Sequence, residues 1–243
     1  MSNSVENRNR SALITGACQG VGLCTARTLA EKGFRIAGVD IQKDVLDAEL
    51  EKISNEYKVE TLSLQADVSN ENEVIAAVSE TVKKFGSIDV LVNNAGIREV
   101  ATVWETSLEL WNHVLSINLQ GEFLFAREVL KQSMLEADSG KIVFISSIAG
   151  LRGSVQSVAY CASKWGIRGL AAGIAQDLKG TGINSTVITP GRTDTPMART
   201  SEQWDPDIGW LDPQAIANTV LYFVSQDSNV EIPEINLFHS VQL

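Results

Sequence analysis

Short apolar runs alternate with longer amphipathic stretches along the whole chain. The apolar runs are rich in β-branched residues and have the length of buried strands; they span 11–15, 34–39, 59–65, 88–92, 142–145, 184–189 and 231–238. The stretches between them repeat apolar residues at helical spacing and predict helices at 22–33, 41–57, 70–85, 108–136, around Tyr160 and at 213–225. The pattern is that of repeated strand and helix units.

Such an alternation predicts an α/β fold. We expect a doubly wound, mostly parallel, seven-stranded sheet with helices on both faces, the Rossmann fold, with ligands at the carboxyl ends of the strands. No break in composition and no low-complexity tract divides the chain, so residues 11–243 are predicted to form a single domain. Residues 1–10 are polar and are predicted to form a disordered N-terminal tail.

Composition and charge narrow the possible functions. The 243 residues are 44% hydrophobic, enough for a full core, and 30 acidic residues against 20 basic ones give a net charge of −10. That balance argues against nucleic acid or an anionic membrane as a partner. The sequence has neither a signal-peptide core nor an apolar run long enough to span a membrane, so we expect a cytoplasmic protein.

Cysteine and histidine are few and scattered. Cys18, Cys24 and Cys161 show no CxxC spacing, which argues against a zinc site or a disulfide framework and favours reduced structural cysteines. His113 and His239 lie far apart in the chain and match no metal-ligand pattern, so we interpret both as structural or surface residues. No metal site is expected.

A glycine-rich turn joins the first predicted strand to the first predicted helix. Gly16, Gly20 and Gly22 follow Thr15 in the pattern TGxxxGxG. Glycine allows the tight dihedral angles and the close approach that let backbone N–H groups and a helix N-terminus face a pyrophosphate. The turn predicts a dinucleotide site, although a glycine cluster alone is weak evidence.

Asp40 follows the second predicted strand, where a dinucleotide fold presents a carboxylate to the hydroxyls of the adenosine ribose. The carboxylate would repel the 2′-phosphate of NADP, and residues 17–19 and Ile41 supply no cation to offset this repulsion. We therefore expect NAD as the cofactor. The alternative is that Asp40 only ends the strand or caps the next helix.

Small and amide side chains follow the third and fourth predicted strands. Asp67 and Val68 stand where an adenine would lie, although Asp67 could equally belong to the cap of the next helix. The run from Asn93 to Gly96 lets the backbone approach a ligand closely, or it forms a purely structural turn. Asn118 lies in an otherwise apolar stretch, so its amide either satisfies a backbone group at a helix kink or reaches into a site.

The fifth predicted strand leads to the residues that we expect to be catalytic. Ser146 and Ser147 stand at its carboxyl end, and Tyr160 and Lys164 follow at a spacing that puts both on one face of a helix, one turn apart. A free phenol has a pKa near ~10 and transfers protons poorly at neutral pH, but a neighbouring ammonium stabilises its ionised form. A lone YxxxK is more often an ordinary surface pair, so this interpretation depends on the other motifs.

Residues 196–211 contain Trp204 and Trp210 among acidic and turn-forming residues. They predict a substrate lid; alternatively the two tryptophans belong to the core or to an interface. Residues 100–104 and 151–157 are expected to complete the pocket, and their side chains suggest a mainly apolar substrate.

Taken together with Pro190-Gly191, these motifs and their order along the chain resemble those of the short-chain dehydrogenase/reductase family. The resemblance covers nearly the whole chain. The resemblance implies an oxidoreductase in which Tyr160 is the catalytic acid/base and Ser147 polarises the substrate oxygen. It also implies that Lys164 holds the nicotinamide ribose and that Asn118 fixes a water that relays protons. The residues that would bind the cofactor are Gly16, Gln19, Gly20, Val21, Gly22, Asp40, Ile41, Asp67, Val68, Asn94, Ala95, Gly96, Tyr160, Lys164, Pro190, Gly191, Thr193 and Thr195.

By the same resemblance, the reaction is hydride transfer between NAD(H) and a secondary alcohol or ketone. The alternatives are an NADPH-dependent carbonyl or 3-oxoacyl reductase and, in a different class, a non-catalytic dinucleotide-sensing or scaffold protein. The family's habit implies a homodimer or homotetramer built on the helices of Asn118 and Tyr160. Two departures from the family are Thr193, where an aliphatic residue is expected after Pro-Gly, and residues 233–240, which lack the common Gly-rich ending.

Overall fold

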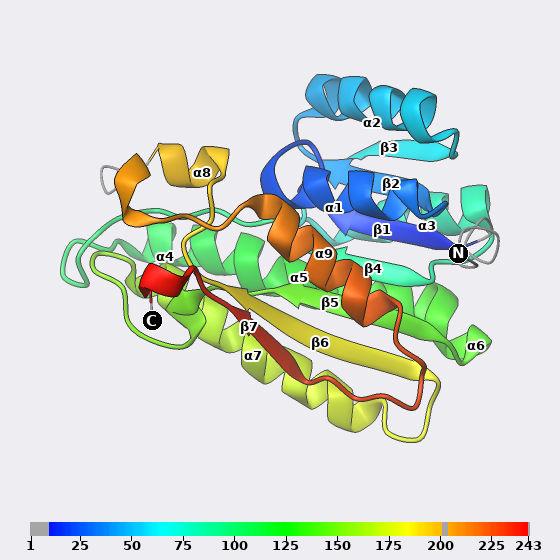
Figure 1. Cartoon of the computed structure of the whole chain (residues 1–243). Helices are drawn as coiled ribbons and strands as arrows, with labels where there is room; N and C mark the ends of the chain where they lie inside the picture. Colours follow the sequence, from blue (N-terminus) through cyan, green and yellow to red (C-terminus); the bar gives the residue numbers. More distant parts are fainter. Residues whose placement is uncertain (1–9, 201–203, 243) are drawn as a thin grey trace.

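A parallel sheet of seven strands runs through the protein in a computed structural model that describes residues 10–200 and 204–242 (Figure 1). The strands are β1 (Ser11–Thr15), β2 (Arg35–Asp40), β3 (Thr61–Gln65), β4 (Val90–Asn93), β5 (Gly140–Ile145), β6 (Ile183–Pro190) and β7 (Glu234–Leu237). Their order across the sheet is β3-β2-β1-β4-β5-β6-β7, and every neighbouring pair is parallel. Of the predicted N-terminal tail, residues 1–9 lie outside the described residues.

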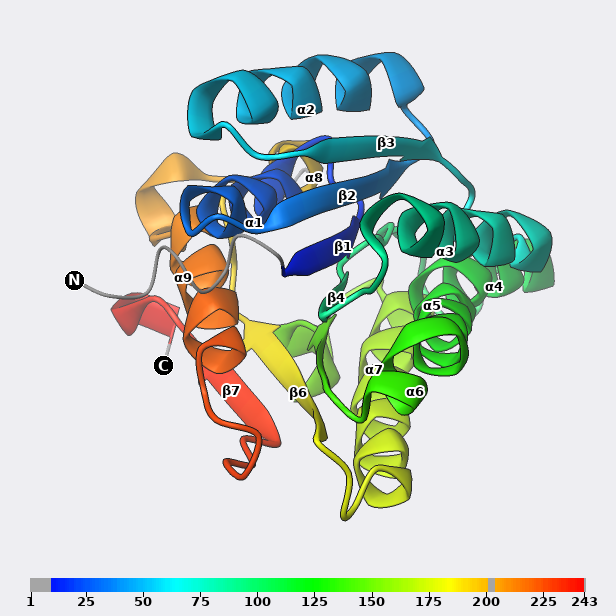
Figure 2. The ribbon, with the colours of Figure 1, turned by 90° about the vertical axis from the view of Figure 1, so that its right-hand side faces the viewer.

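Helices cover both faces of this sheet (Figure 2). One face packs against α1 (Gly20–Glu31), α2 (Lys43–Tyr57) and α9 (Pro213–Val224). The other packs against α3 (Glu71–Phe85), α5 (Gly121–Val129) and α7 (Val158–Asp177), and α4 (Leu108–Leu115) lies beside α7. The short helix α6 (Leu135–Ala137) ends the helical stretch that contains α5, and the short helix α8 (Pro196–Arg199) follows β6. The predicted Rossmann fold is confirmed, and no helix in the described ranges is both long and apolar enough to cross a membrane.

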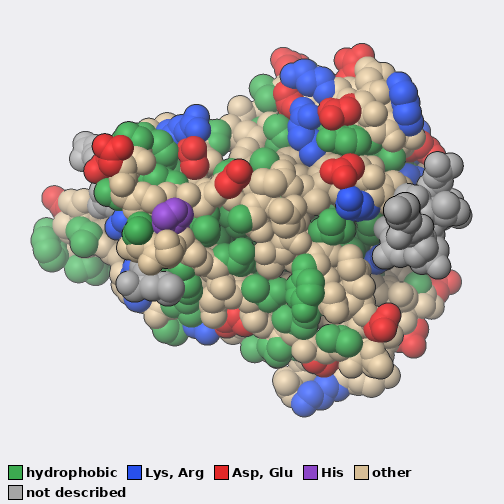
Figure 3. All heavy atoms as spheres, viewed as in Figure 1, with side chains coloured by type: hydrophobic (Ala, Val, Ile, Leu, Met, Phe, Trp, Pro, Cys, Tyr) green, Lys and Arg blue, Asp and Glu red, His purple; other side chains and the backbone are tan. Residues whose placement is uncertain are grey.

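Local sequence explains why these helices form and which side they bury. In α2, Leu46, Leu50 and Ile53 are spaced along one face and are buried, and each contributes roughly 1.5–3 kcal/mol by leaving water. The opposite face of α2 is covered with acidic and basic side chains (Figure 3). Asp212 caps α9, because its side chain accepts a hydrogen bond from the backbone N–H of Gln214 and proline follows it.

The helical stretch at 108–136 is not the continuous helix that its pattern predicts. Two turns of π-helix, Ser116–Gln120 and Leu130–Met134, separate α4, α5 and α6. A π-turn inserts one extra residue and shifts the side chains that follow it around the helix axis. Asn118 lies within the first of these turns.

The strand order also fixes where a ligand can bind. The chain passes from β1 outward to β2 and β3 and then returns to β4 on the other side of β1. The segments that leave β1 and β4 therefore diverge at their carboxyl ends and open a crevice between them.

Candidate active site

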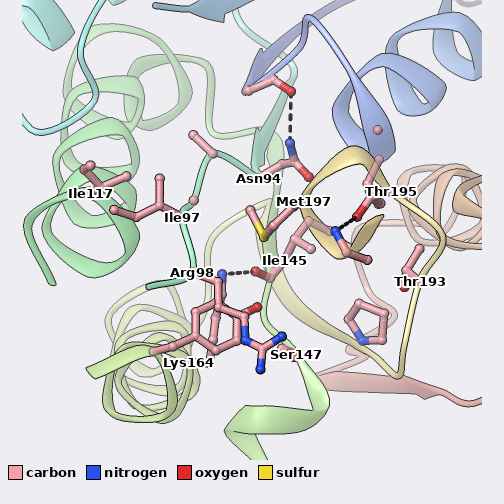
Figure 4. Close-up of a pocket in the computed structure, with 18 of the residues that line it drawn as sticks. Asn94, Ile97, Arg98, Ile117, Ile145, Ser147, Lys164, Thr193, Thr195 and Met197 are labelled. Carbon is pink, nitrogen blue, oxygen red and sulfur yellow. Dashed lines mark hydrogen bonds between the residues drawn. The ribbon is translucent and has the colours of Figure 1, made fainter. Parts of the chain in front are cut away.

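A cavity of about 720 Å³ opens along the carboxyl ends of the strands, and Figure 4 shows part of its lining. Most of the residues predicted for the site line it. They are Gly16, Gln19, Gly20, Val21, Asp40, Ile41, Asp67, Val68, Asn94, Ala95, Gly96, Ser147, Tyr160, Lys164, Pro190, Gly191, Thr193 and Thr195. Gly22 and Asn118, also predicted, do not line the cavity themselves, but they contact Gly16 and Ile97, which do.

The glycine turn after β1 is closely packed. Gly16 and Gly20 have φ angles of +64° and +57°, which favour glycine. A Cβ atom on Gly22 would lie 2.1 Å from the carbonyl oxygen of Gly16, so only glycine lets α1 start this close to the turn. The Asn94 side chain locks the turn by donating hydrogen bonds to the carbonyl oxygens of Thr15 and Gly16, at 2.9 and 3.2 Å.

The N-terminus of α1 therefore faces the cavity with its backbone donors. Its N-cap residue, Gln19, makes no side-chain capping hydrogen bond. The first N–H groups of a helix have no partner within the helix, and the helix dipole favours an anion there. The turn is thus a fitting cradle for the phosphates of a dinucleotide.

Asp40 is fixed at the end of β2. Its carboxylate accepts hydrogen bonds from the backbone N–H groups of Cys18, at 3.3 Å, and Gln42, at 3.1 Å. Asp67, at the end of the next strand, accepts bonds from the backbone and hydroxyl of Ser69, whereas the cap of α3 is Asn70. Both carboxylates line the cavity, so Asp67 is not the helix cap that was its alternative interpretation.

The thiol of Cys18 lies behind this carboxylate and is 2% exposed. Burial, and then the adjacent Asp40, raise the pKa of the Cys18 thiol to about 12. The amide of Gln42 also lies 3.4 Å from its sulfur. Cys18 is therefore a packed structural thiol, as predicted.

The end of β5 is fastened to α7 around a buried ammonium. Lys164 is 4% exposed, and its Nζ donates a hydrogen bond to the carbonyl oxygen of Ile145 at 2.8 Å. The hydroxyl of Ser146 donates to the Lys164 carbonyl oxygen at 2.9 Å. The Lys164 Nζ lies 5.9 Å from the centre of the Tyr160 ring, and both side chains line the cavity. The predicted pairing of these two residues on one helix face is therefore present.

Close approach at this junction requires glycine. A Cβ atom on Gly150 would lie 2.6 Å from the Ser146 hydroxyl and 2.7 Å from the Lys164 carbonyl oxygen. Gly150 ends a turn of 3₁₀ helix, Ile148–Gly150, that Ser147 caps by accepting a hydrogen bond from the Ala149 N–H at 3.2 Å. This bond orients Ser147, which Figure 4 shows at the same end of the cavity as Lys164.

Asn118 holds the loop that follows β4. Its Oδ1 accepts a hydrogen bond from the Ile97 N–H at 2.8 Å, and its Nδ2 donates to the Ile97 carbonyl oxygen at 2.9 Å. Nδ2 also donates to the Ser163 hydroxyl at 3.1 Å, which links the loop to α7. The sequence left open whether Asn118 satisfies a backbone group at a helix kink or reaches into a site. Its amide satisfies the backbone groups of Ile97, in the loop that lines the cavity, and not those of its own helix.

Glu122 is a functional candidate that the sequence analysis missed. Its side chain is buried, and its Oε1 lies 3.7 Å from the Lys164 Nζ, the distance of an ion pair without a hydrogen bond. Neither carboxyl oxygen has a hydrogen-bond partner in the described structure. Burial raises the pKa of Glu122 from 4.5 to about 8, outweighing the opposite effect of the lysine. The signal in the sequence is its i+4 spacing from Asn118.

Parts of the segments predicted for the lid and the pocket line the cavity, and the lid itself stays a prediction. Residues 201–203 lie outside the described residues. On either side of them, Met197 and Trp210 line the cavity, and the rings of Trp204 and Trp210 lie against each other, tilted by 37°, with their centres 4.3 Å apart. Residues 152–154 line the same cavity, whereas residues 100–104 do not.

The cavity is also lined by charged and imidazole side chains. Arg98, His113 and Arg192 lie outside the segments predicted for the pocket, whereas Arg152 lies within the predicted segment 151–157. The expectation of a mainly apolar pocket is therefore incomplete.

Three known proteins or families show what the chain is similar to. Residues 10–206 match the family model described as short chain dehydrogenase. The 2-(R)-hydroxypropyl-CoM dehydrogenase of Xanthobacter autotrophicus is 36% identical over 212 residues, 86% of this chain and 83% of that protein. A 3-alpha-(or 20-beta)-hydroxysteroid dehydrogenase of Mycobacterium bovis is 35% identical over 225 residues, 90% of this chain and 83% of that protein.

The fold of this chain is also similar to that of solved structures. A variant of actinorhodin polyketide ketoreductase, solved with NADPH, matches with a TM-score of 0.89 and 32% identity. The match covers 96% of this chain and 97% of that chain. The likeness therefore extends over the sheet, its helices and the cavity at the strand ends.

The buried carboxyl of Glu122 predicts a specific dependence of stability on pH. A pKa raised from 4.5 to about 8 means that the folded state binds more protons than the unfolded state between these values. The contribution of Glu122 to the free energy of unfolding is therefore greatest below pH 4.5 and falls as the pH rises toward 8. We expect the wild type to lose at least about 1 kcal/mol relative to Glu122→Gln between pH 5 and pH 8.5, measured by urea unfolding.

The matched control is Glu136→Gln, which removes a carboxyl from an exposed position in α6, at the end of the same helical stretch. Its stability should follow that of the wild type over the same pH range. Parallel pH profiles for the wild type and Glu122→Gln would contradict the assignment of a buried, protonated Glu122.

Proposed function

Because the chain belongs to the short-chain dehydrogenase/reductase family, we propose that it transfers a hydride between NAD(H) and a secondary alcohol or its ketone. The observation that carries the proposal is the group of Ser147, Tyr160 and Lys164 around one end of the cavity. A nicotinamide, when bound, supplies the hydride acceptor or donor that no side chain can provide.

The residues present fit such a cofactor. The glycine turn and the uncapped start of α1 would bind the two phosphates, and Asp40 would accept hydrogen bonds from the adenosine ribose. The adenine would lie against Asp67 and Val68. A Cβ atom on Gly20 would lie 3.5 Å from the Thr195 methyl group, so the segment after β6 approaches the glycine turn closely.

In this proposal, Tyr160 transfers the proton. During oxidation, the phenolate of Tyr160 takes the hydroxyl proton of the alcohol while the carbon gives up its hydride. Ser147 donates a hydrogen bond to the substrate oxygen, and the Lys164 Nζ lies 5.9 Å from the centre of the Tyr160 ring. Asn118 positions the loop around Ile97 rather than touching the substrate.

The preference for NAD rests on charge near the ribose. Asp40 is held by two backbone N–H groups, and its neighbours along the cavity wall, Ile41 and Gln42, are uncharged. A 2′-phosphate would approach a carboxylate without a cation from these neighbours, which supports NAD over NADP. One similar structure is a ketoreductase solved with NADPH, so membership of the family does not decide between the two cofactors. The proposed preference for NAD therefore rests on the residues of this chain around Asp40.

We also propose a homodimer or homotetramer that buries α5 and α7. Phe123 on α5 and Trp165 on α7 are 42% and 49% exposed, and both helices cover the same face of the sheet. Large apolar side chains on adjacent helices are typical of an interface. A cytoplasmic location stays a prediction.

The role of Tyr160 predicts a loss of turnover without a loss of cofactor. In Tyr160→Phe the ring remains and the transferable proton is removed, so kcat should fall about 10²–10⁴-fold. The NAD dissociation constant should stay within about twofold. Secondary alcohols are screened with the wild type by NADH absorbance, and the best one is used for the variant. Tyr222→Phe, on the exposed side of α9, is the control. Full activity of Tyr160→Phe would refute the proposed mechanism.

The role of Asp40 predicts a change in cofactor preference. Asp40→Asn removes the charge and keeps one acceptor oxygen, so NADP should gain on NAD by at least about tenfold, or ~1.4 kcal/mol. Fluorescence titration with NADH and NADPH measures both affinities. Asp44→Asn, an exposed change of the same charge in α2, should leave the ratio unchanged. Tighter binding of NADPH than NADH by the wild type would favour the NADPH-dependent reductase instead.

The proposed interface predicts an oligomer that one charge can weaken. Light scattering after size exclusion should give two or four times the 26.3 kDa of one chain. Trp165→Glu should lower that mass, because an interface buries an unpaired charge at high cost. Trp104→Glu, on a residue that is 81% exposed, should not. A monomeric wild type would exclude this interface.

A further inference from the structure

The face of α7 that carries Tyr160 and Lys164 carries a third long side chain one turn further on. Arg168 follows Lys164 at the spacing by which Lys164 follows Tyr160, so the three residues lie in one row along the helix. Tyr160 and Lys164 line the cavity, whereas Arg168 does not. Any effect of Arg168 on the reaction therefore passes through other residues.

The Arg168 guanidinium donates hydrogen bonds from all three of its nitrogen atoms. Its Nε and Nη2 donate to the same oxygen of the Glu234 carboxylate, at 3.1 and 2.9 Å, and its Nη1 donates to the Gly150 carbonyl oxygen at 3.0 Å. The two charged side chains are 28% and 25% exposed, so the ion pair is largely shielded from water. Glu234 is the first residue of β7, and Gly150 is the last of the 3₁₀ turn after β5. One side chain therefore joins α7 to the last strand and to this turn.

The bond to Gly150 satisfies a carbonyl group at the end of a helical turn. The last carbonyl groups of such a turn have no partner within it, and a basic side chain can supply one. A hydrogen bond from a charged donor is also stronger than one between neutral groups. The rigid fork of a guanidinium reaches the carbonyl group and the carboxylate at once, whereas a lysine offers one nitrogen to both.

Ser147 stands between two fastened points of the backbone. Before it, the Ser146 N–H donates to the Ile188 carbonyl oxygen in β6 at 2.9 Å. After it, Arg168 holds Gly150. The hydrogen bond that caps the turn occupies a lone pair of the Ser147 hydroxyl oxygen and leaves the hydroxyl hydrogen for a substrate. The direction of that hydrogen depends on the backbone of the turn, whose far end is held by Arg168.

We propose that Arg168, held by Glu234, is a positioning residue for hydride transfer, and that it acts by fixing the turn from which Ser147 donates to the substrate oxygen. The inference rests on the proposed function, because it takes Ser147 to bind that oxygen. A hydrogen bond to an oxygen with developing negative charge is strongest in the transition state. A loosened turn therefore lowers kcat more than it raises KM.

Arg168→Met tests this proposal, because methionine keeps an apolar stem and removes every donor. We expect kcat with the best secondary alcohol of the screen to fall at least about tenfold, while KM changes by less than about threefold. The NAD dissociation constant should stay within about twofold, since Arg168 does not line the cavity. Arg168→Lys keeps the charge beside Glu234 but has one nitrogen for two partners, so its kcat should fall at least about threefold.

A double-mutant cycle with Ser147→Ala shows whether Arg168 acts through Ser147. Without the Ser147 hydroxyl the turn has no donor to orient, so adding Arg168→Met to Ser147→Ala should lower kcat by less than about threefold more. A further loss of threefold or more in that background, or a wild-type kcat in both Arg168 variants, would overturn the inference alone. A wild type that oxidises none of the secondary alcohols with NAD would contradict the proposed function and the inference with it.

Arg127→Met is the matched control. Arg127 also pairs with carboxylates, those of Glu71 and Glu128, lies over an aromatic ring, that of Phe123, and has a side chain that is 27% exposed. It does not line the cavity. Its loss removes comparable bonds far from the turn, so kcat should stay within about twofold of the wild type. A fall in kcat as large as that of Arg168→Met would show a general effect of losing such an arginine and would exclude a specific role for Arg168.

Discussion

The buried ammonium of Lys164 is the constraint around which the catalytic half of this protein is arranged. An ammonium removed from water costs several kcal/mol unless it is paired and hydrogen-bonded. Here the Ile145 carbonyl oxygen accepts a hydrogen bond from the Lys164 Nζ, and the buried Glu122 carboxyl lies 3.7 Å from it without a hydrogen bond. The end of β5, α5 and α7 are therefore bound to one point, and the position of Tyr160 follows from it.

The same constraint explains glycines that the motifs alone leave unexplained. A Cβ on Gly96 would lie 3.2 Å from the Asn118 amide oxygen and 3.8 Å from the Lys164 Nζ, and a Cβ on Gly150 would press on the backbone of Lys164. These residues are small because the loops after β4 and β5 pack closely against the Asn118 amide and the Lys164 backbone. The first π-turn belongs to the same arrangement, since it contains Asn118, whose amide ties the β4 loop to α7.

The strands and helices of this architecture could be predicted from the sequence, whereas contacts between residues distant in the chain could not. Strands and helices are encoded by local periodicity, so each predicted strand coincides with an observed one, with ends that differ by up to three residues. Glu122 was missed because its role depends on a neighbour distant in the chain. Glu122 and Lys164 are 42 positions apart in the sequence and lie side by side in the fold. No periodicity records such contacts. The π-turns were missed because they change the hydrogen bonding of a helix without changing its hydrophobic pattern.

The thiol behind Asp40 has a consequence for the chemical durability of the protein. Nucleophilic attack by cysteine requires the thiolate, and a pKa of about 12 leaves almost none of it at neutral pH. Cys18 stands within the glycine turn and is 2% exposed, so reagents have little access to its sulfur. Burial, and then the Asp40 carboxylate, keep this thiol protonated and so protect it from peroxide and from alkylating reagents.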